Sequence, residues 1–318
     1  MGGEWKEYSV DDVKAPVPNA LATGPFGSSI GSQHFRDEGV PLLRGSNLSH
    51  ETGKRLVEED LTFVTSQKAA EHERSMVRHG DLVFTCWGNI NQVGLIDERS
   101  RYPEYLLSNK QMKLTPNSQR FDSLFLYYLF SSPQIQQQIS SQEIGSTIPG
   151  FNLSQLRALR IHAPPLEEQR RIARALGVLD DRIEVNQRIG DTLESMARAL
   201  FKSWFVNFDP VRAKVEGRET GLPVEIAELF PDGFAESELG QIPSGWHVGR
   251  FGDVVEQLRE QENPLTSPEV RFLHLSIPAF DDGQNPKAER GEDIKSHKFR
   301  VPVGAVLLSK LNPEIERV

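Results

Sequence analysis

Polar side chains gather at four places in the first half of the chain, three of them beside glycines, where they could bind a ligand by hydrogen bonding. Arg, Lys, Asn, Gln, Ser and Thr supply the donors and acceptors that read base edges in DNA. A neighbouring glycine lets the backbone approach such a ligand closely. The candidate residues are Ser28, Ser29, Arg44 and Asn47; Trp87 and Asn89; Asn109, Lys110 and Gln111; and Ser146, Thr147 and Gly150.

Plainer explanations exist for these groups. Loops rich in glycine and proline are usually turns, and Asn47 could cap one of them through its own side chain. Trp5 and Trp246 more often anchor a sheet than contact a ligand. Residues 121–130 carry aromatics at helical spacing, which predicts the buried face of a core helix.

Sequence patterns of catalysis are missing. Gly53-Lys54 is followed by Arg55, and no glycine precedes it at the spacing of a phosphate-binding Walker loop. We find no glycine-rich S-adenosylmethionine loop after a strand, no Asn-Pro-Pro-aromatic tetrad and no nuclease centre. The eight histidines lack metal-ligand spacing, and the single cysteine, Cys86, excludes an internal disulfide and a cysteine zinc site. We therefore expect a protein without metal or catalytic residues.

Length and charge limit the possible classes. The 318 residues suffice for about two domains. No long apolar run or basic-then-apolar N-terminal signal is present, so we expect a cytoplasmic protein without a membrane partner. A net charge of −9 argues against a basic DNA-coating protein. Residues 101–165, however, hold six Lys/Arg against three Asp/Glu, which allows a local basic face.

The elements that must position the candidate residues lie in a mixed α/β domain, residues 1–163. Short apolar runs there alternate with Gly, Pro and Asn. They predict strands at Val40–Arg44, Asp81–Thr85, Gln92–Ile96 and Leu156–His162. Helices are expected at Ser66–Arg74 and Asp122–Ser131.

A long helix is predicted over residues 164–208. Two prolines and two glutamates suit a helix start, and Asp209-Pro210 ends the pattern. About 40 helical residues span roughly 60 Å. Mostly apolar residues spaced alternately four and three positions apart form a seam along this helix, which needs a partner to bury it. Asn186 within the seam could fix the register of the helix against that partner. The alternative is a helix packed on its own domain. The seam is Ile172, Leu176, Leu179, Ile183, Asn186, Gly190, Leu193, Ala197, Leu200 and Trp204.

A linker, residues 209–238, leads to a second domain, residues 239–318, which looks like a partial copy of the first. Trp5 precedes Asp12-Val13 by the same offset as Trp246 precedes Asp253-Val254. Residues 40–43 and 80–84 find weak counterparts at 270–273 and 304–308, in the same order. The second copy lacks the latter half of the first, so we expect a truncated second domain.

These segments resemble the specificity subunits of type I restriction-modification enzymes. The segment from Leu166-Glu167-Glu168-Gln169 to Trp204-Phe205 is similar to their conserved central region. Residues 239–246 are similar to the start of their second target-recognition domain. Loops in the first domain add weaker likeness, at 23–28, 41–47 and 145–152.

The resemblance implies an α+β fold: a mixed α/β target-recognition domain, a long central coiled-coil-type helix and a partial second recognition domain. Each domain would read half of a bipartite site in double-stranded DNA, with the helix as the spacer. Methyltransferase subunits would supply S-adenosylmethionine chemistry. Motor-nuclease subunits would use ATP and Mg for cleavage. The chain itself would carry no cofactor and would not be an enzyme.

Two alternatives stay open from the sequence. The chain could be a shortened subunit that serves as an assembly partner or forms a self-dimer reading a palindromic site. It could also be an unrelated coiled-coil scaffold that binds no DNA.

Overall fold

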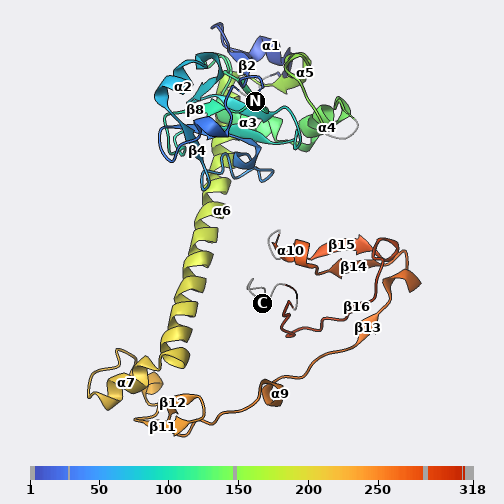
Figure 1. Cartoon of the computed structure of the whole chain (residues 1–318). Helices are drawn as coiled ribbons and strands as arrows, with labels where there is room; N and C mark the ends of the chain where they lie inside the picture. The colour runs from blue at the N-terminus through green and yellow to red at the C-terminus, as the bar shows by residue number, and fades with distance from the viewer. Residues whose placement is uncertain (1–3, 28, 146–148, 282–285, 310, 312–318) are drawn as a thin grey trace. The chain divides into compact units, whose positions relative to one another are not determined.

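The structure is a computed structural model that describes residues 4–27, 29–145, 149–281, 286–309 and 311. The chain forms two compact units, Met1–Arg198 and Ala199–Val318 (Figure 1). The fold is α+β, as the sequence predicted. Among the described residues, no helix is both long and apolar enough to cross a membrane.

Two four-stranded sheets form the centre of the first unit. The first sheet is antiparallel, in the order β2 (Leu21–Thr23), β9 (Gln111–Leu114), β6 (Leu82–Thr85) and β7 (Val93–Leu95). The second has the order β4 (Thr62–Val64), β3 (Val40–Leu43), β8 (Glu104–Leu107) and β5 (Met76–Arg78), with β3 and β8 parallel. Separately, β1 (Lys6–Ser9) pairs with β10 (Arg160–Ala163).

The two sheets pack face to face between layers of helices. Leu82 and Phe84 of β6 belong to the core on the helical side, whereas Val83 belongs to the core shared with the second sheet. On β8, Tyr105 and Leu107 face the first sheet, and Leu106 packs with Ala69 of helix α2. Leu82, Val83 and Phe84 of β6 and Tyr105, Leu106 and Leu107 of β8 are buried in succession because both strands are covered on both faces, which explains why these runs do not alternate with polar residues.

Short helices cover these sheets. They are α1 (Val10–Val13), α2 (Ser66–Ala70), α3 (Ser123–Phe130), α4 (Pro133–Ser141) and α5 (Leu153–Ala158), with single turns of 3-10 helix at η1 (Ser32–His34), η2 (Gly45–Asn47) and η3 (Glu73–Ser75). Helix α3 carries the predicted aromatic face: Phe125, Tyr127 and Phe130 are buried.

The strand predicted at Leu156–His162 is wrong in its first part. Asn152 and Gln155 form reciprocal side-chain-to-backbone hydrogen bonds of 3.0 and 2.8 Å, which start helix α5. The chain becomes extended only at β10. The other predicted strands correspond to β3, β6 and β7. The helix predicted at Ser66–Arg74 is split into α2 and the turn η3.

Helix α6 (Leu166–Phe201) begins directly after the two prolines, as predicted. Its first part is docked on the unit through Gln169, Ala173 and Gly177, which lie four residues apart on one face and are buried. Gln169 accepts a hydrogen bond from the Asp122 N–H (3.0 Å). It donates to the carbonyls of Arg120 (3.1 Å) and Pro164 (2.8 Å).

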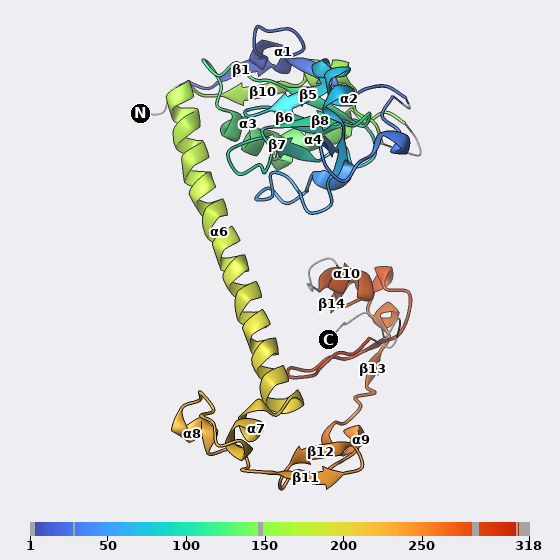
Figure 2. The same ribbon diagram turned by 60° about the vertical axis from the view of Figure 1, so that its left-hand side comes forward.

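Polar contacts extend this docking by two more turns. Tyr128 donates a hydrogen bond of 2.5 Å to Asp180, and Arg99 forms ion pairs with Asp181 and Glu184. Past Glu184, every residue of α6 up to Arg198 is exposed. Packing of the helix on its own unit, the alternative raised by the sequence, therefore applies only to its first half. Figure 2 shows α6 leaving the body of the first unit.

The predicted seam is largely uncovered within the first unit. Leu179 and Leu193 are 55% and 59% exposed. A second exposed stripe, Val178, Val185, Ile189 and Met196, was not recognised from the sequence. Each of its residues precedes a seam residue by one position, so this stripe lies roughly 100° around the helix from the seam. Two adjacent apolar stripes form a wider surface than one coiled-coil seam requires.

In the second unit, the long helix passes into a π-helical turn, η4 (Lys202–Val206), and Phe208 adopts a left-handed conformation (φ 57°). The remaining elements are α7 (Asp209–Val215), α8 (Val224–Ala227), β11 (Phe234–Ser237), β12 (Gly240–Pro243), α9 (Phe251–Val254), β13 (Gln261–Glu262), η5 (Pro264–Thr266), β14 (Arg271–His274), α10 (Ile277–Asp281), β15 (Lys287–Arg290), η6 (Gly291–Asp293) and β16 (Lys298–Phe299). The strands pair as β11–β12, β13–β16 and β14–β15.

An aromatic cluster holds the start of this unit together. Trp246 stacks on Phe205 with ring centroids 6.2 Å apart and meets Phe208 edge-on at 5.6 Å. Trp204 packs edge-on against Phe230 at 5.6 Å. Trp246 therefore packs against aromatic residues at the end of the long helix, whereas the sequence analysis expected it to anchor a sheet.

Local structure agrees with the predicted repeat at two of its three matches. Asp12 accepts the Ser9 N–H (2.9 Å) in α1, and Asp253 accepts the Arg250 N–H (3.0 Å) in α9. Strands β3 and β14 also correspond. The third match differs, because residues 305–309 form no strand where the first copy has β6.

Replacement of Gln169 by Ala should destabilise the protein by about 2–4 kcal/mol, because three backbone groups would lose a buried partner. The matched control is Gln187→Ala, an exposed position on the same helix, which should change stability by less than about 0.5 kcal/mol. Urea unfolding of the full chain, followed by circular dichroism, measures both. Equal stability of the two variants would contradict this account of the docking.

Candidate nucleic-acid interface

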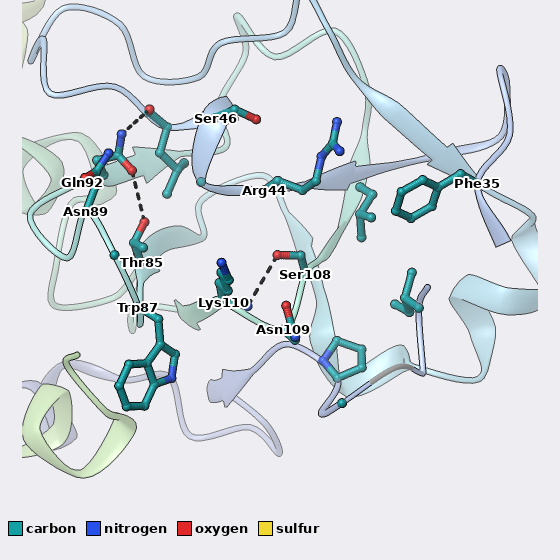
Figure 3. A pocket seen from close by; sticks show the side chains of 17 residues that line it. Phe35, Arg44, Ser46, Thr85, Trp87, Asn89, Gln92, Ser108, Asn109 and Lys110 are labelled. Carbon is teal, nitrogen blue, oxygen red and sulfur yellow. Dashed lines mark hydrogen bonds between the residues drawn. The ribbon is translucent and has the colours of Figure 1, made fainter. Parts of the chain in front are cut away.

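A pocket of about 690 Å³ opens where three turns of the first unit meet. It is bordered by the turn after β3, the segment from β6 to β7 and the turn between β8 and β9, together with Pro25, Gly27, Ile30 and Phe35. Figure 3 shows Arg44 and Ser46 on one side, Trp87 on the opposite side, and Ser108, Asn109 and Lys110 between them.

Five predicted candidates from separate parts of the sequence line this pocket: Arg44, Trp87, Asn89, Asn109 and Lys110. Arg44 and Lys110 are its two cations, and none of the described lining residues is acidic. This composition contrasts with the chain's net charge of −9. The pocket can therefore bind an electron-rich ligand that offers hydrogen-bond acceptors.

Two predicted candidates instead lie beneath the pocket as buried supports. Asn47 is 1% exposed; its side chain accepts the Arg44 N–H (3.0 Å) and donates to the Val57 carbonyl (3.0 Å). Gln111 is fully buried. With its amide oriented to satisfy its neighbours, it accepts the Gly45 N–H (3.0 Å) and donates to the Leu43 carbonyl (3.1 Å). The sequence-based assignment of both as ligand contacts is corrected, and the capping alternative holds for Asn47.

A third buried amide, Gln92, was missed as a support. It donates 2.8 Å to the Leu48 carbonyl and accepts from the Thr85 hydroxyl at 3.4 Å. Nothing in the sequence around Gln92 indicated that its side chain bonds to a residue 44 positions earlier in the chain. Phe35, whose ring lies under the Arg44 guanidinium at 5.9 Å, was also missed.

The Trp87 indole closes one side of the pocket by packing on Gly150. A Cβ at Gly150 would lie 2.5 Å from the indole ring, so the position needs glycine. Backbone bonds from Gly88 to the Pro149 carbonyl (2.9 Å) and from Phe151 to the Cys86 carbonyl (2.8 Å) join the two segments. Gly150 thus supports Trp87, which stays 45% exposed.

The thiol of Cys86, which precedes Trp87 in the sequence, is not a nucleophile. Burial raises the pKa of Cys86 to about 12, so the thiol stays protonated near neutral pH.

Of the remaining candidates, Ser29 lies outside the pocket lining and donates a 2.7 Å hydrogen bond to the Phe26 carbonyl. Ser28, Ser146 and Thr147 fall outside the described residues.

Comparison with known proteins gives a family match over part of the chain. Residues 44–195 match the type I restriction modification DNA specificity domain. Over these residues the chain is similar to the specificity subunits of type I restriction enzymes. The matched segment includes the pocket from Arg44 onward and most of helix α6.

Curated relatives in this family share moderate identity with the chain. The HindI specificity subunit of Haemophilus influenzae is 28% identical over 228 residues, 71% of this chain and 46% of the relative. The MjaIX specificity subunit of Methanocaldococcus jannaschii is 28% identical over 234 residues, 69% of this chain and 50% of the relative. The chain spans about half the length of these specificity subunits.

Solved structures of the same family also align. The type I S subunit from M. genitalium gives a TM-score of 0.41 at 16% identity, covering 68% of this chain and 47% of that chain. The HsdS subunit from Thermoanaerobacter tengcongensis gives 0.42 at 16% identity, covering 87% and 57%.

Gly24→Ala should distort the pocket, because its Cβ would lie 1.7 Å from the Ser108 carbonyl oxygen. We expect a loss of about 2 kcal/mol or more in the free energy of unfolding. Gly45→Ala is the control: Gly45 lines the pocket, and the nearest atom would be 3.8 Å from the new Cβ. Urea unfolding should leave Gly45→Ala close to wild type. A Gly24→Ala variant as stable as Gly45→Ala would contradict the close approach.

Proposed function

We propose that this chain recognises a specific DNA sequence as a non-catalytic subunit of a type I restriction-modification complex. The observation that carries the proposal is the pocket itself. It gathers hydrogen-bonding side chains and two cations without an acid, and most of it lies within the family's DNA specificity domain. Such groups can read base edges while the cations offset phosphate charge.

Catalysis then belongs to partner subunits. Methyltransferase subunits would supply S-adenosylmethionine chemistry, and motor-nuclease subunits would use ATP and Mg for cleavage. The pocket fits this division because the polar side chains of its described lining are amides, hydroxyls, an indole, a guanidinium and an ammonium group, without a carboxylate or an imidazole. None of them is a general base at neutral pH.

Helix α6 provides the surface for the methyltransferase subunits. Its first half is fixed to the DNA-reading unit by Gln169, Ala173 and Gly177, while two apolar stripes remain exposed farther along. Burial of apolar surface favours association by about 25 cal/mol per Å². A bound subunit would thus be held at a set position relative to the pocket.

The target is proposed to be bipartite, with the second half-site read by a second domain that begins near Trp246. Support comes from the agreement between α1 and α9 and between β3 and β14. A self-dimer, which would read a palindromic site, remains a separate prediction. Light scattering of the purified chain distinguishes a monomer from a dimer.

Methylome sequencing tests the DNA-recognition role. The chain is expressed with its cognate methyltransferase subunit in a host that lacks other modification systems. We expect one methylated motif that disappears when the chain is omitted. The same sites methylated with and without the chain, or no methylation with both subunits present and assembled, would contradict the proposal.

Leu179→Lys should weaken assembly with the methyltransferase by at least about tenfold, because a charge would be buried in an apolar contact. The free chain should keep its stability within about 0.5 kcal/mol, since Leu179 is 55% exposed there. Ser195→Lys, exposed on another face of the same helix, is the matched control and should assemble normally. Pull-down titrations measure both, and unchanged assembly of Leu179→Lys would exclude this surface.

A further inference from the structure

We propose that Arg44 is a specificity-determining residue that recognises a guanine in the target through the fork of its guanidinium group. The inference rests on the proposed function and concerns the same pocket. It assigns one side chain to one base and separates Arg44 from the other cation of the pocket, Lys110.

The backbone that carries Arg44 is fixed by buried amides. The Arg44 N–H is bound by Asn47 at 3.0 Å, and the Gly45 N–H by Gln111 at 3.0 Å. The end of the same turn is held by Gln92, which donates to the Leu48 carbonyl at 2.8 Å. Breaking any of these bonds would leave a buried polar group unsatisfied, at about 1–3 kcal/mol each. The turn therefore holds one conformation, and the Arg44 side chain starts from a fixed point.

The side chain itself is positioned but lacks acceptors. Its guanidinium lies over the Phe35 ring at 5.9 Å, a contact that favours the planar cation. The Arg44 Nε is buried without a hydrogen-bond partner, and no acidic side chain among the described residues pairs with this guanidinium. Buried donors normally have partners. A ligand that supplies acceptors would complete the site.

Guanine fits these constraints better than a phosphate does. Its O6 and N7 are two acceptors on one edge, matching two parallel N–H donors of arginine. Adenine presents a donor, N6, where guanine has O6, so a fixed arginine discriminates between them by about 1–3 kcal/mol. A phosphate can be contacted without two parallel N–H donors held in a fixed position. The single ammonium group of a lysine such as Lys110 is sufficient for that contact.

The roles predict different responses to substitution in the same pocket. Arg44→Gln should abolish the preference for guanine at one position of the target while the rest of the methylated motif persists. Lys110→Gln removes one positive charge from the same pocket and is the matched control. It should weaken binding to all sequences alike and keep the motif, with a smaller salt dependence.

The decisive experiment uses the full chain assembled with its methyltransferase subunit. After the wild-type motif is known, each guanine in a duplex oligonucleotide is replaced in turn by 7-deazaguanine, which lacks the N7 acceptor. At one position, wild type should lose about 5-fold or more in affinity, whereas Arg44→Gln should bind both duplexes equally. Arg44→Lys should retain part of the preference. Thermal melting of each variant confirms folding, since no described hydrogen bond uses the Arg44 guanidinium.

The outcomes separate this inference from the proposed function. A motif without guanine would overturn the assignment, as would an Arg44→Gln complex that keeps the full wild-type motif and stays sensitive to every 7-deazaguanine. In both cases DNA recognition by the chain would stand. Failure of the wild-type complex to bind or methylate any sequence selectively would overturn the proposed function and, with it, the role of Arg44.

Discussion

A side-chain amide buried in a protein must find hydrogen-bond partners, and this requirement shapes both functional parts of the chain. Asn47, Gln92 and Gln111 meet it by binding the backbone around the Arg44 turn. Gln169 meets it by joining helix α6 to the backbone at Asp122, Arg120 and Pro164. An apolar side chain at any of these positions would leave backbone groups without partners. The pocket and the start of the helix are therefore positioned by the same kind of interaction within the first unit.

The helix combines a docked half and an exposed half, and this division has a physical consequence. Long apolar side chains from Leu176 onward remain in contact with water, although an isolated helix gains little stability from its own backbone hydrogen bonds. Ion pairs on its surface, such as Arg198 with Glu194, add only a few tenths of a kcal/mol each. The apolar stripes therefore gain most of their stabilisation when a partner covers them.

The sequence predicted the features that follow from periodicity. It identified the α+β class, the start of α6 after the two prolines, the buried face of α3 and the strands β3, β6 and β7. It also named five of the residues that line the pocket. It could not separate Asn47 and Gln111 from Arg44 and Lys110, because the same residue types serve ligands and buried turns. Only the tertiary fold decides which amide points inward. Gln92 was missed because its partner, the Leu48 carbonyl, lies 44 residues away in sequence. Phe35 was missed because the sequence pattern does not show that its ring lies under the Arg44 guanidinium.

Charge distribution bears on how an acidic chain could perform the proposed reading of DNA. Non-specific affinity for DNA comes mainly from neutralised phosphates, and it falls steeply with salt. A chain with a net charge of −9 gains little from that source, so its contribution must be local. A pocket whose described lining holds Arg44 and Lys110 and no acid would meet this need, because it could discriminate among bases without strong general attraction. Affinity would then come chiefly from the assembled partners, and sequence choice from the rigid turn at Arg44. Such a division would allow the DNA sequence that the chain recognises to change through a few pocket side chains, while the surface for the partners stays the same.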